Sequence, residues 1–228
     1  VIFLLFSLIA VVGVYTPPTI SLEWDSIAYH LADPKLYVLA HRIYYLPWES
    51  HSNFAFTTEM WYTASLLFSS VPLAKWFHFS CGVGMCLAAY ALAARHIGPK
   101  VGIWTAVILA STPLVLSEAG IAYADLATTY FATLSVLCVV AGLKTRCRAW
   151  LIVGAILMGL TLSTKATALS ILILLAVGLI YYRWQVLKDR LPKALALAAA
   201  WCALAVVVGS PWYIKSAVLT GNPVYPFY

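Results

Sequence analysis

Carboxylates and imidazoles, the side chains that most often move protons or bind metals in enzymes, are concentrated in one polar stretch of this sequence, residues 16–59. The stretch interrupts a chain that is otherwise mostly apolar. We therefore expect any chemistry to be located there. It contains five of the eight acidic residues and three of the five histidines, together with one arginine: Glu23, Asp25, Asp33, Glu49, Glu59, His30, His41, His51 and Arg42.

A second candidate centre is the polar turn formed by Ser163, Thr164 and Lys165 between two apolar runs. A lysine at mid-bilayer costs a few kcal/mol, so Lys165 is expected at the tip, where the following helix begins. Free backbone N–H groups, a Ser163 or Thr164 hydroxyl and the ammonium together predict an anion site. The alternative is a lysine that only snorkels to the membrane interface.

Asp125 is the third candidate, expected about one turn into a helix that begins near Ala119. A carboxylate in such a helix is most simply explained as a residue that faces the bundle and has a partner or a task. The alternative is a helix-start carboxylate that interacts favourably with the helix dipole.

Membrane helices must position these side chains. The chain of 228 residues is 63% hydrophobic and only 10% charged, and its mean hydropathy is +0.91. These values exclude an ordinary soluble domain and indicate a polytopic, all-α membrane protein. Residues 1–14 are too few to cross a bilayer, and we interpret them as the end of a first transmembrane helix rather than as a signal peptide. The five cysteines lack CxxC spacing and are expected to pack in the core.

The distribution of charge predicts the topology. Three breaks between apolar runs are basic, at residues 95–100, 144–148 and 183–193, and Lys and Arg are retained in cytoplasmic loops. These breaks should therefore share one side, with the acidic tip at 118–125 and the turn at 163–165 on the other. About seven crossings satisfy this pattern. The polar stretch at residues 16–59 is then an exoplasmic loop. The net charge of +6 is thereby explained without a nucleic-acid partner.

Within the loop, two short amphipathic helices are expected to lie along the membrane surface. Asp25 is predicted to be the N-cap of the first, which continues to Leu31. Asp33 followed by Pro34 repeats this signal for a second helix through Ile43. The sequence is thus interpreted as a single transmembrane domain, 1–228, that contains this loop.

Several short motifs are spread along the chain. They are Glu23-Trp24-Asp25-Ser26-Ile27-Ala28-Tyr29-His30-Leu31, Pro34-Lys35-Leu36-Tyr37, His51-Ser52-Asn53-Phe54, Thr57-Thr58-Glu59-Met60, Tyr123-Ala124-Asp125, Thr164-Lys165, Pro211-Trp212-Tyr213-Ile214-Lys215 and Thr220-Gly221-Asn222-Pro223-Val224-Tyr225-Pro226. These motifs resemble the first exoplasmic loop and catalytic half of bacterial membrane glycosyltransferases of the GT-C superfamily, in particular family 39-like proteins akin to protein O-mannosyltransferases and the aminoarabinose transferase of lipid A. The resemblance covers nearly the whole chain, which is similar to the N-terminal part of longer family members.

The resemblance implies transfer of a sugar, with inversion, from a polyprenyl-phosphate donor to an acceptor hydroxyl. Such chemistry needs a carboxylate to deprotonate the acceptor and cations to hold the departing phosphate. Carried over residue by residue, Asp25 is the candidate general base, Lys165 the phosphate ligand and Asp125 a second acidic residue on the acceptor side. Arg42 and His51 are weaker candidates for phosphate or acceptor contacts.

Two further acidic residues match the family pattern less informatively. Glu59 stands where the family has a glutamate, with no task that its position explains, and Glu23 is adjacent to Asp25 and could share its role. No cofactor is required by this reading. A divalent metal is conceivable among the carboxylates and imidazoles, although their spacing matches no ligand signature.

The partners implied are the polyprenyl-phosphate sugar, a lipid, glycan or protein acceptor, and membrane lipids. The implied location is a bacterial inner (plasma) membrane, with the site facing the periplasm or exterior. The competing interpretation is a polytopic transporter or lipid flippase that uses the same polar tips as a solute path. The inverted repeats and broken helices typical of transporters are not evident in the sequence.

Overall fold

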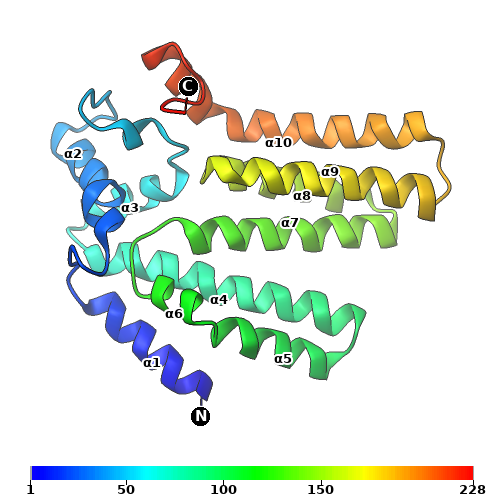
Figure 1. Cartoon of the computed structure of the whole chain (residues 1–228), viewed down its shortest axis with the longest axis horizontal. Helices are drawn as coiled ribbons and strands as arrows, with labels where there is room; N and C mark the ends of the chain where they lie inside the picture. Colours follow the sequence, from blue (N-terminus) through cyan, green and yellow to red (C-terminus); the bar gives the residue numbers. More distant parts are fainter. Residues whose placement is uncertain (1, 228) are drawn as a thin grey trace.

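The protein is a bundle of helices with a polar insert packed against one end (Figure 1). The structure, a computed structural model, describes the backbone of residues 2–227 and the side chains from Ser7 to Phe227. All regular secondary structure within these residues is helical. In chain order the helices are α1 (Ile2–Tyr15), η1 (Ser26–His30), α2 (Ala32–Ala40), η2 (Ser50–Asn53), α3 (Thr57–Leu67), α4 (Val71–His96), α5 (Pro99–Ala110), α6 (Pro113–Ala119), α7 (Asp125–Thr145), α8 (Arg148–Leu162), η3 (Ala166–Ala168), α9 (Leu169–Tyr181), η4 (Tyr182–Val186) and α10 (Leu191–Thr220).

Four helical segments are long and apolar enough to cross a membrane, and a fifth is added if one bent pair counts as a span. The four are Val71–His96, Asp125–Thr145, Ala166–Val186 and Leu191–Thr220. This confirms the prediction of an all-helical membrane bundle. The seven predicted crossings are not confirmed, because α8 has only 15 residues, less than the roughly 20 that span a bilayer, and α5 and α6 form one bent pair.

The bent pair is α5 and α6, which meet at 65°. No broken helix was expected from the sequence in this region. Thr112 adopts an extended backbone conformation, with φ −68° and ψ 124°, directly before Pro113. Because the proline ring disfavours a helical conformation in the preceding residue, the helix must break here and restart at Pro113.

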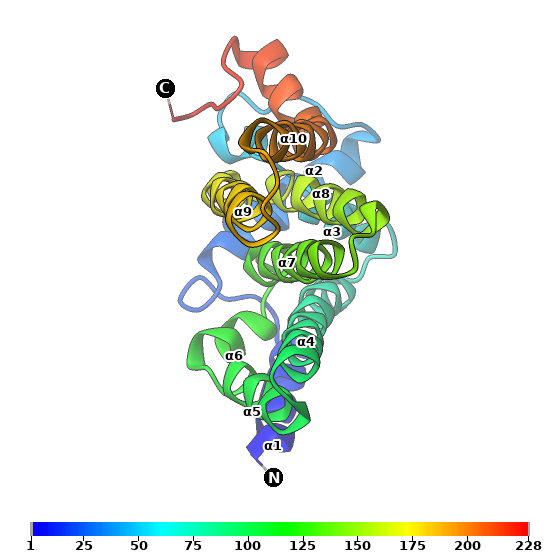
Figure 2. The same ribbon diagram turned by 90° about the vertical axis from the view of Figure 1, so that its right-hand side faces the viewer.

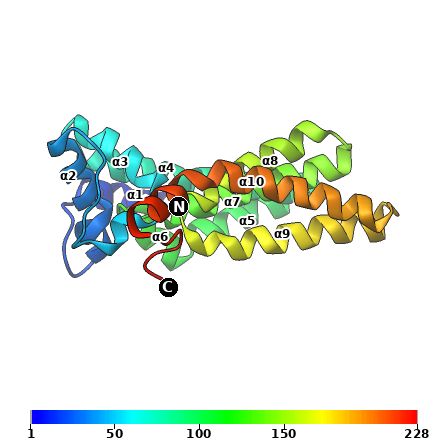
Figure 3. The same ribbon diagram turned by 90° about the horizontal axis from the view of Figure 1, so that it is seen from above.

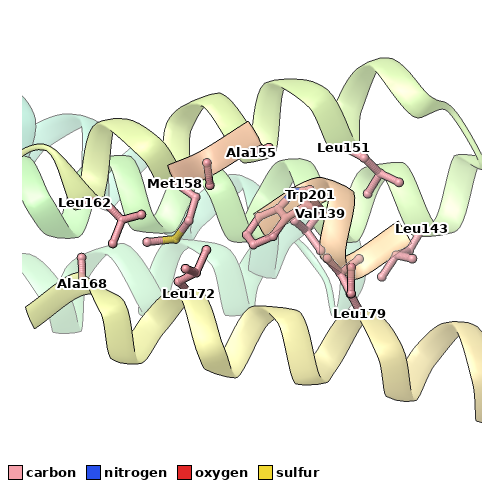
Figure 4. Packing of buried hydrophobic residues seen from close by; sticks show 12 residues of the cluster. Val139, Leu143, Leu151, Ala155, Met158, Leu162, Ala168, Leu172, Leu179 and Trp201 are labelled. Atoms are coloured by element: carbon pink, nitrogen blue, oxygen red, sulfur yellow. The ribbon is translucent and has the colours of Figure 1, made fainter. Parts of the chain in front are cut away.

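Apolar side chains from α7, α8, α9 and α10 form the largest core cluster, and these helices lie side by side (Figures 3 and 4). Met158 of α8 packs close to Leu172 of α9 in this cluster. At Gly159, an added Cβ would lie 2.5 Å from the Val208 Cβ and 2.7 Å from the Ala205 carbonyl oxygen. The absence of a side chain therefore lets α8 approach α10 closely, as small residues do in membrane bundles, and brings the end of α8 alongside α10.

The three basic turns lie together at one end of the bundle, on the right in Figure 1 and facing the viewer in Figure 2. Lys144 and His96, from two of these turns, are in contact with 2.7 Å between Nζ and Nδ1. The insert and the turns before α7 and after α8 lie at the opposite end. The predicted separation of basic turns from acidic tips is therefore confirmed.

The insert contains η1, α2, η2 and the start of α3, but its helices begin differently from the prediction. Asp25 occupies the N-cap position of η1 with a helical backbone and makes no capping hydrogen bond. Asp33 does not cap α2, which starts at Ala32 and ends at Ala40. Instead the Asp33 side chain is only 2% exposed, because α2 turns this face toward the inside of the insert.

The burial of Asp33 makes the stability of the fold depend on pH. Its pKa is raised from 3.8 to about 7, mainly by burial and secondly by the negative charge of Glu49. Between these two pH values the folded protein binds more protons than the unfolded chain, so stability falls as pH rises through this window. We expect a loss on the order of 3 kcal/mol between pH 4 and pH 8 from this group.

Substituting Asp33→Asn removes the titration. Unfolding in mixed micelles, followed at pH 5 and pH 8, should show a clearly smaller loss of stability at pH 8 in the variant than in the wild type. An equal loss in both proteins would show that Asp33 is ionised at low pH in the folded state.

Candidate active site

Three segments that are distant in sequence meet at the end of the bundle opposite the basic turns: the insert, the segment before α7 and the turn after α8. The backbone N–H of Thr57 donates to the Ser163 carbonyl at 3.0 Å. The Trp212 indole N–H of α10 donates to the Thr57 hydroxyl at 2.8 Å, and the Tyr213 hydroxyl donates to the Leu162 carbonyl at 2.9 Å. The turn that carries Lys165 is thus fixed against both the insert and α10.

Lys165 and Asp125 form an ion pair, with 2.7 Å between Nζ and Oδ1. Lys165 lies in extended backbone immediately before η3. Asp125 is the first residue of α7, so the prediction that this helix begins near Ala119 was wrong: α6 ends there instead. The two side chains are 42% and 44% exposed, and an ammonium has three N–H donors, so Lys165 keeps donors for a second anion.

The neighbouring hydroxyls do not join Lys165 in an anion site, and this part of the prediction was wrong. Ser163 and Thr164 both donate their hydroxyl hydrogens to the Leu160 carbonyl, each at 2.8 Å. The following helix η3 has only three residues and presents no extended row of N–H groups. Any affinity of this turn for anions therefore depends on the ammonium of Lys165.

Helix η1 is docked directly on the segment before α7. The buried Ser26 hydroxyl donates to the Ala122 carbonyl and accepts from the Ala122 N–H, both at 3.3 Å. The Asp25 N–H donates to the Tyr123 hydroxyl at 3.3 Å, and the Tyr62 hydroxyl of α3 donates to the Tyr123 carbonyl. These bonds bring Asp25 to the same end of the bundle as Asp125 and Lys165.

Tyr29 connects the Asp25 carboxylate with the other acidic groups. Its hydroxyl donates to Asp25 Oδ2 at 3.3 Å. The pKa of Tyr29 is raised above its ordinary value first by burial and then by the negative charges of Asp25, Glu59 and Asp125. The three carboxylates, two from the insert and one from the start of α7, are therefore close enough to act electrostatically on one phenol.

A pocket of about 100 Å³ opens beside Tyr29. It is enclosed by the insert, the start of α3, the residue before α7 and the turn after α8. The polar side chains that line it include those of Tyr29, His30, Glu59 and Lys165, and Phe54 and Phe56 supply apolar walls. The pocket thus combines an ammonium, an imidazole and a carboxylate with aromatic surface.

His30 and Glu59 face each other in this pocket, with 2.5 Å between Nδ1 and Oε1. The two residues are buried, at 4% and 2% exposure. Glu59 was a candidate without a task, and His30 was not selected as a site residue. The available signal was the occurrence of both residue types in the insert, but 29 positions separate them, so spacing alone could not pair them.

His78 is a second histidine that sequence reasoning missed. It is fully buried in α4, and its Nδ1–H lies 3.0 Å from the carbonyls of both Glu118 and Ile121. Its Nε2 accepts from the Leu126 N–H at 3.0 Å, which fixes the ring in the neutral form with the proton on Nδ1. His78 therefore holds the segment that leads into Asp125.

The two weaker candidates lie outside the pocket. His51 contacts Glu49 at 2.5 Å and stacks on Tyr29 with 4.4 Å between ring centroids. Arg42 is exposed and lies over the Tyr44 ring. Neither is among the described residues that line the pocket. Their roles at a phosphate or an acceptor stay predictions.

Glu23 has a different environment from its neighbour Asp25. Its carboxylate pairs with Lys75 of α4 at 2.6 Å, and both side chains are buried. The same ammonium donates to the carbonyls of Gly13 and Thr16, at 3.3 and 2.9 Å, where α1 ends. Lys75 therefore ties the start of the insert and the end of α1 to α4, and a share in the chemistry of Asp25 stays a prediction for Glu23.

Breaking this pair should destabilise the fold. In the Glu23→Gln variant the Lys75 ammonium stays buried without its counter-ion, and we expect a loss of about 3 kcal/mol in the free energy of unfolding. The double variant Glu23→Gln with Lys75→Met removes the buried charge and should recover most of the loss. Unfolding curves in mixed micelles measure both values, and equal stability of wild type and Glu23→Gln would contradict the assignment.

No group of three or more His, Cys, Asp or Glu residues within residues 2–227 is arranged to hold a metal ion. The pocket contains one imidazole and one carboxylate in contact, which is fewer ligands than a dedicated site uses. The expectation that the reaction requires no metal stays a prediction.

The fold and the site together define an integral membrane protein in which apolar helices carry a polar pocket at one end. The family model of dolichyl-phosphate-mannose-protein mannosyltransferases matches residues 24–220, a range that includes Asp25, Asp125 and Lys165. The chain belongs to this family and is a membrane glycosyltransferase. Comparison with curated proteins and with solved structures gives no match.

Proposed function

We propose that this glycosyltransferase moves a sugar from a polyprenyl-phosphate donor to an acceptor hydroxyl, with inversion. The acceptor belongs to a lipid, a glycan or a protein. The reaction takes place at the exoplasmic end of the bundle, which in a bacterial inner membrane faces the periplasm or exterior. The observation that carries the proposal is that Lys165 and Tyr29 line one pocket, while Asp125 pairs with Lys165 and Asp25 accepts a hydrogen bond from Tyr29.

Each of the three residues has a chemical task. Asp25 accepts the proton of the acceptor hydroxyl, and the freed oxygen forms a bond to C1 of the sugar. The bond between C1 and the phosphate oxygen breaks, and its electron pair stays on the phosphate. Lys165 balances the charge that develops there, and Asp125 holds Lys165 in place as a second acidic residue on the acceptor side. Attack from the face opposite the phosphate inverts the configuration at C1.

The positions of the basic turns support this sidedness. Lys and Arg are retained on the cytoplasmic side, and the three basic turns lie at the end opposite the pocket. A donor that reaches the pocket must therefore do so from the exoplasmic leaflet. A polyprenyl-phosphate sugar meets this requirement, because its lipid stays in the membrane while its phosphate and sugar reach the interface.

Lipid copurified with the full-length protein tests the donor. We expect mass spectrometry to find a polyprenyl phosphate or phosphosugar with the wild type and much less with Lys165→Met. Purified protein in proteoliposomes should also consume polyprenyl-phosphate mannose when membrane-extracted acceptors are added, in the presence and absence of EDTA. Bulk phospholipid alone, together with no consumption of this donor, would overturn the proposal.

A further inference from the structure

The charged residues predicted from the sequence do not give the pocket beside Lys165 a net positive charge that would attract a phosphate. The ammonium of Lys165 is paired with the Asp125 carboxylate, and the buried Glu59 adds a further negative charge to the same pocket. With a neutral His30 these three groups sum to a net negative charge. An anionic donor would then be repelled by the site that should bind it.

Among the described residues that line the pocket, His30 is the imidazole, and its protonation brings this sum to zero. Its Nδ1 lies 2.5 Å from Glu59 Oε1, closer than the roughly 2.7–2.9 Å of charge-assisted N–H···O bonds, so the two groups are in direct hydrogen-bond contact. The other oxygen of Glu59, Oε2, is buried and has no hydrogen-bond partner among the described residues. A buried carboxylate with a single partner is best stabilised when that partner carries the opposite charge.

The local backbone directs His30 toward the pocket. Residues Ser26–His30 form a π-helix, closed by the Leu31 N–H on the Ser26 carbonyl at 2.9 Å. One extra residue in the turn rotates the following side chains relative to an α-helix, and such turns are frequent at functional sites. Ser26 is hydrogen-bonded to the backbone of Ala122, and these bonds hold the turn that carries His30 in place.

We propose that His30 is a second phosphate-contacting residue of the donor pocket, acting in its imidazolium form beside Glu59 and together with Lys165. With Nδ1–H donated to Glu59, the ring presents Nε2–H to a phosphate oxygen. When the bond between C1 and the phosphate oxygen breaks, the phosphate gains one negative charge, and the imidazolium and the ammonium balance it. No proton transfer from His30 is needed for this balance. The inference rests on the proposed function, because it assigns a residue to that donor.

Binding of a phosphodiester probe at two pH values tests the inference. A polyprenyl methyl phosphate keeps one negative charge between pH 6 and pH 8, so any pH dependence of its affinity belongs to the protein. Full-length wild-type protein in detergent should bind it about tenfold more tightly at pH 6, since a hydrogen bond to a charged group contributes about 1.5–3 kcal/mol. His30→Gln should bind more weakly and lose this pH dependence.

The other titratable groups around His30 are tested in the same binding experiment by separate variants. Glu59, the rings of Tyr29 and Tyr123, and His78 of α4 surround it, and Lys165 lines the same pocket. Lys165→Met should bind more weakly at both pH values and keep the difference between them. His96→Gln, a histidine substitution at the opposite end of the bundle, serves as the matched control and should behave as the wild type.

A variant that keeps the ring guards against a simple folding defect. Glu59→Gln leaves His30 in place but removes the charge that favours the imidazolium, so this variant should bind the probe more weakly than the wild type at pH 6. In transfer assays we expect His30→Gln to lower kcat roughly tenfold to a hundredfold.

The outcomes separate this inference from the proposed function. If the wild type binds the probe and transfers sugar, but His30→Gln keeps its affinity and pH dependence, the inference alone is overturned. The same holds if His51→Gln, and not His30→Gln, abolishes the pH dependence. If the wild type neither binds the probe nor consumes polyprenyl-phosphate mannose, the proposed function is overturned and the inference with it.

Discussion

Replacing Lys165 with methionine is expected to lower kcat for sugar transfer by about 10³-fold, because the departing phosphate loses the nearest ammonium. Methionine keeps most of the length and apolar volume of the lysine stem. Since the Lys165 side chain is 42% exposed, its partner Asp125 can be solvated in the variant, and the fold should be retained. Initial rates with saturating polyprenyl-phosphate mannose, together with an unfolding curve, measure the two effects separately.

Two comparisons make the Lys165 result specific. Lys165→Arg retains a cation but changes its shape, so it should recover part of the lost rate. Lys193→Met removes an exposed lysine at the opposite end of the bundle and should leave the rate unchanged. A rate for Lys165→Met within about twofold of the wild type would remove Lys165 from the mechanism, because loss of a stabilising charge in the transition state costs far more.

Substituting Asp25→Asn should be the most damaging single change to the chemistry, with a loss in kcat of about 10³–10⁴-fold. Asparagine has the same shape and can still accept the hydrogen bond from Tyr29, but it cannot take a proton from the acceptor hydroxyl. Because donor binding does not use this carboxylate, the affinity for polyprenyl methyl phosphate should be unchanged.

The matched control for Asp25 is Asp189→Asn, which breaks the ion pair with Arg183 in a basic turn at the other end. It should retain transfer. If Asp25→Asn weakens donor binding as much as it lowers the rate, the carboxylate helps to hold the donor and another residue must accept the proton. Asp125, which lies within electrostatic reach of the same tyrosine, is the residue to test next.

The large-scale arrangement could be predicted because it depends on patterns that act over whole segments. Basic residues recur in three breaks, which must share one side of the membrane. The helices between two breaks therefore form hairpins whose polar tips lie at the other side. Lys165 was expected at a tip because a lysine in lipid is costly, and the structure places it there with Asp125 as its partner. Bending between α5 and α6 was missed, although Pro113 supplied the signal.

The finer contacts could not be predicted, because they depend on which side chains a packed fold brings together. Lys75 and His78 stand in an apolar run, and nothing local indicates that Glu23 and the segment 118–126 will meet them. Asp33 matched a capping pattern, yet the packing of α2 buried it. The π-turn at Ser26–His30, which aims His30 at the pocket, has no sequence pattern comparable to the periodicity of a helix.

The buried contact of Lys75 with Glu23 bears on how the protein is made. During insertion, α4 carries a cation that lipid tails would not solvate, at a cost of several kcal/mol. The carboxylate that neutralises it belongs to an earlier part of the polypeptide, and so do the carbonyls of Gly13 and Thr16. The Glu23 carboxylate and the two carbonyls are therefore synthesised before the Lys75 ammonium that binds them. Helix α1 and the insert are thus already made when α4 enters the membrane, and a variant that lacks residues 1–23 should be degraded before it matures.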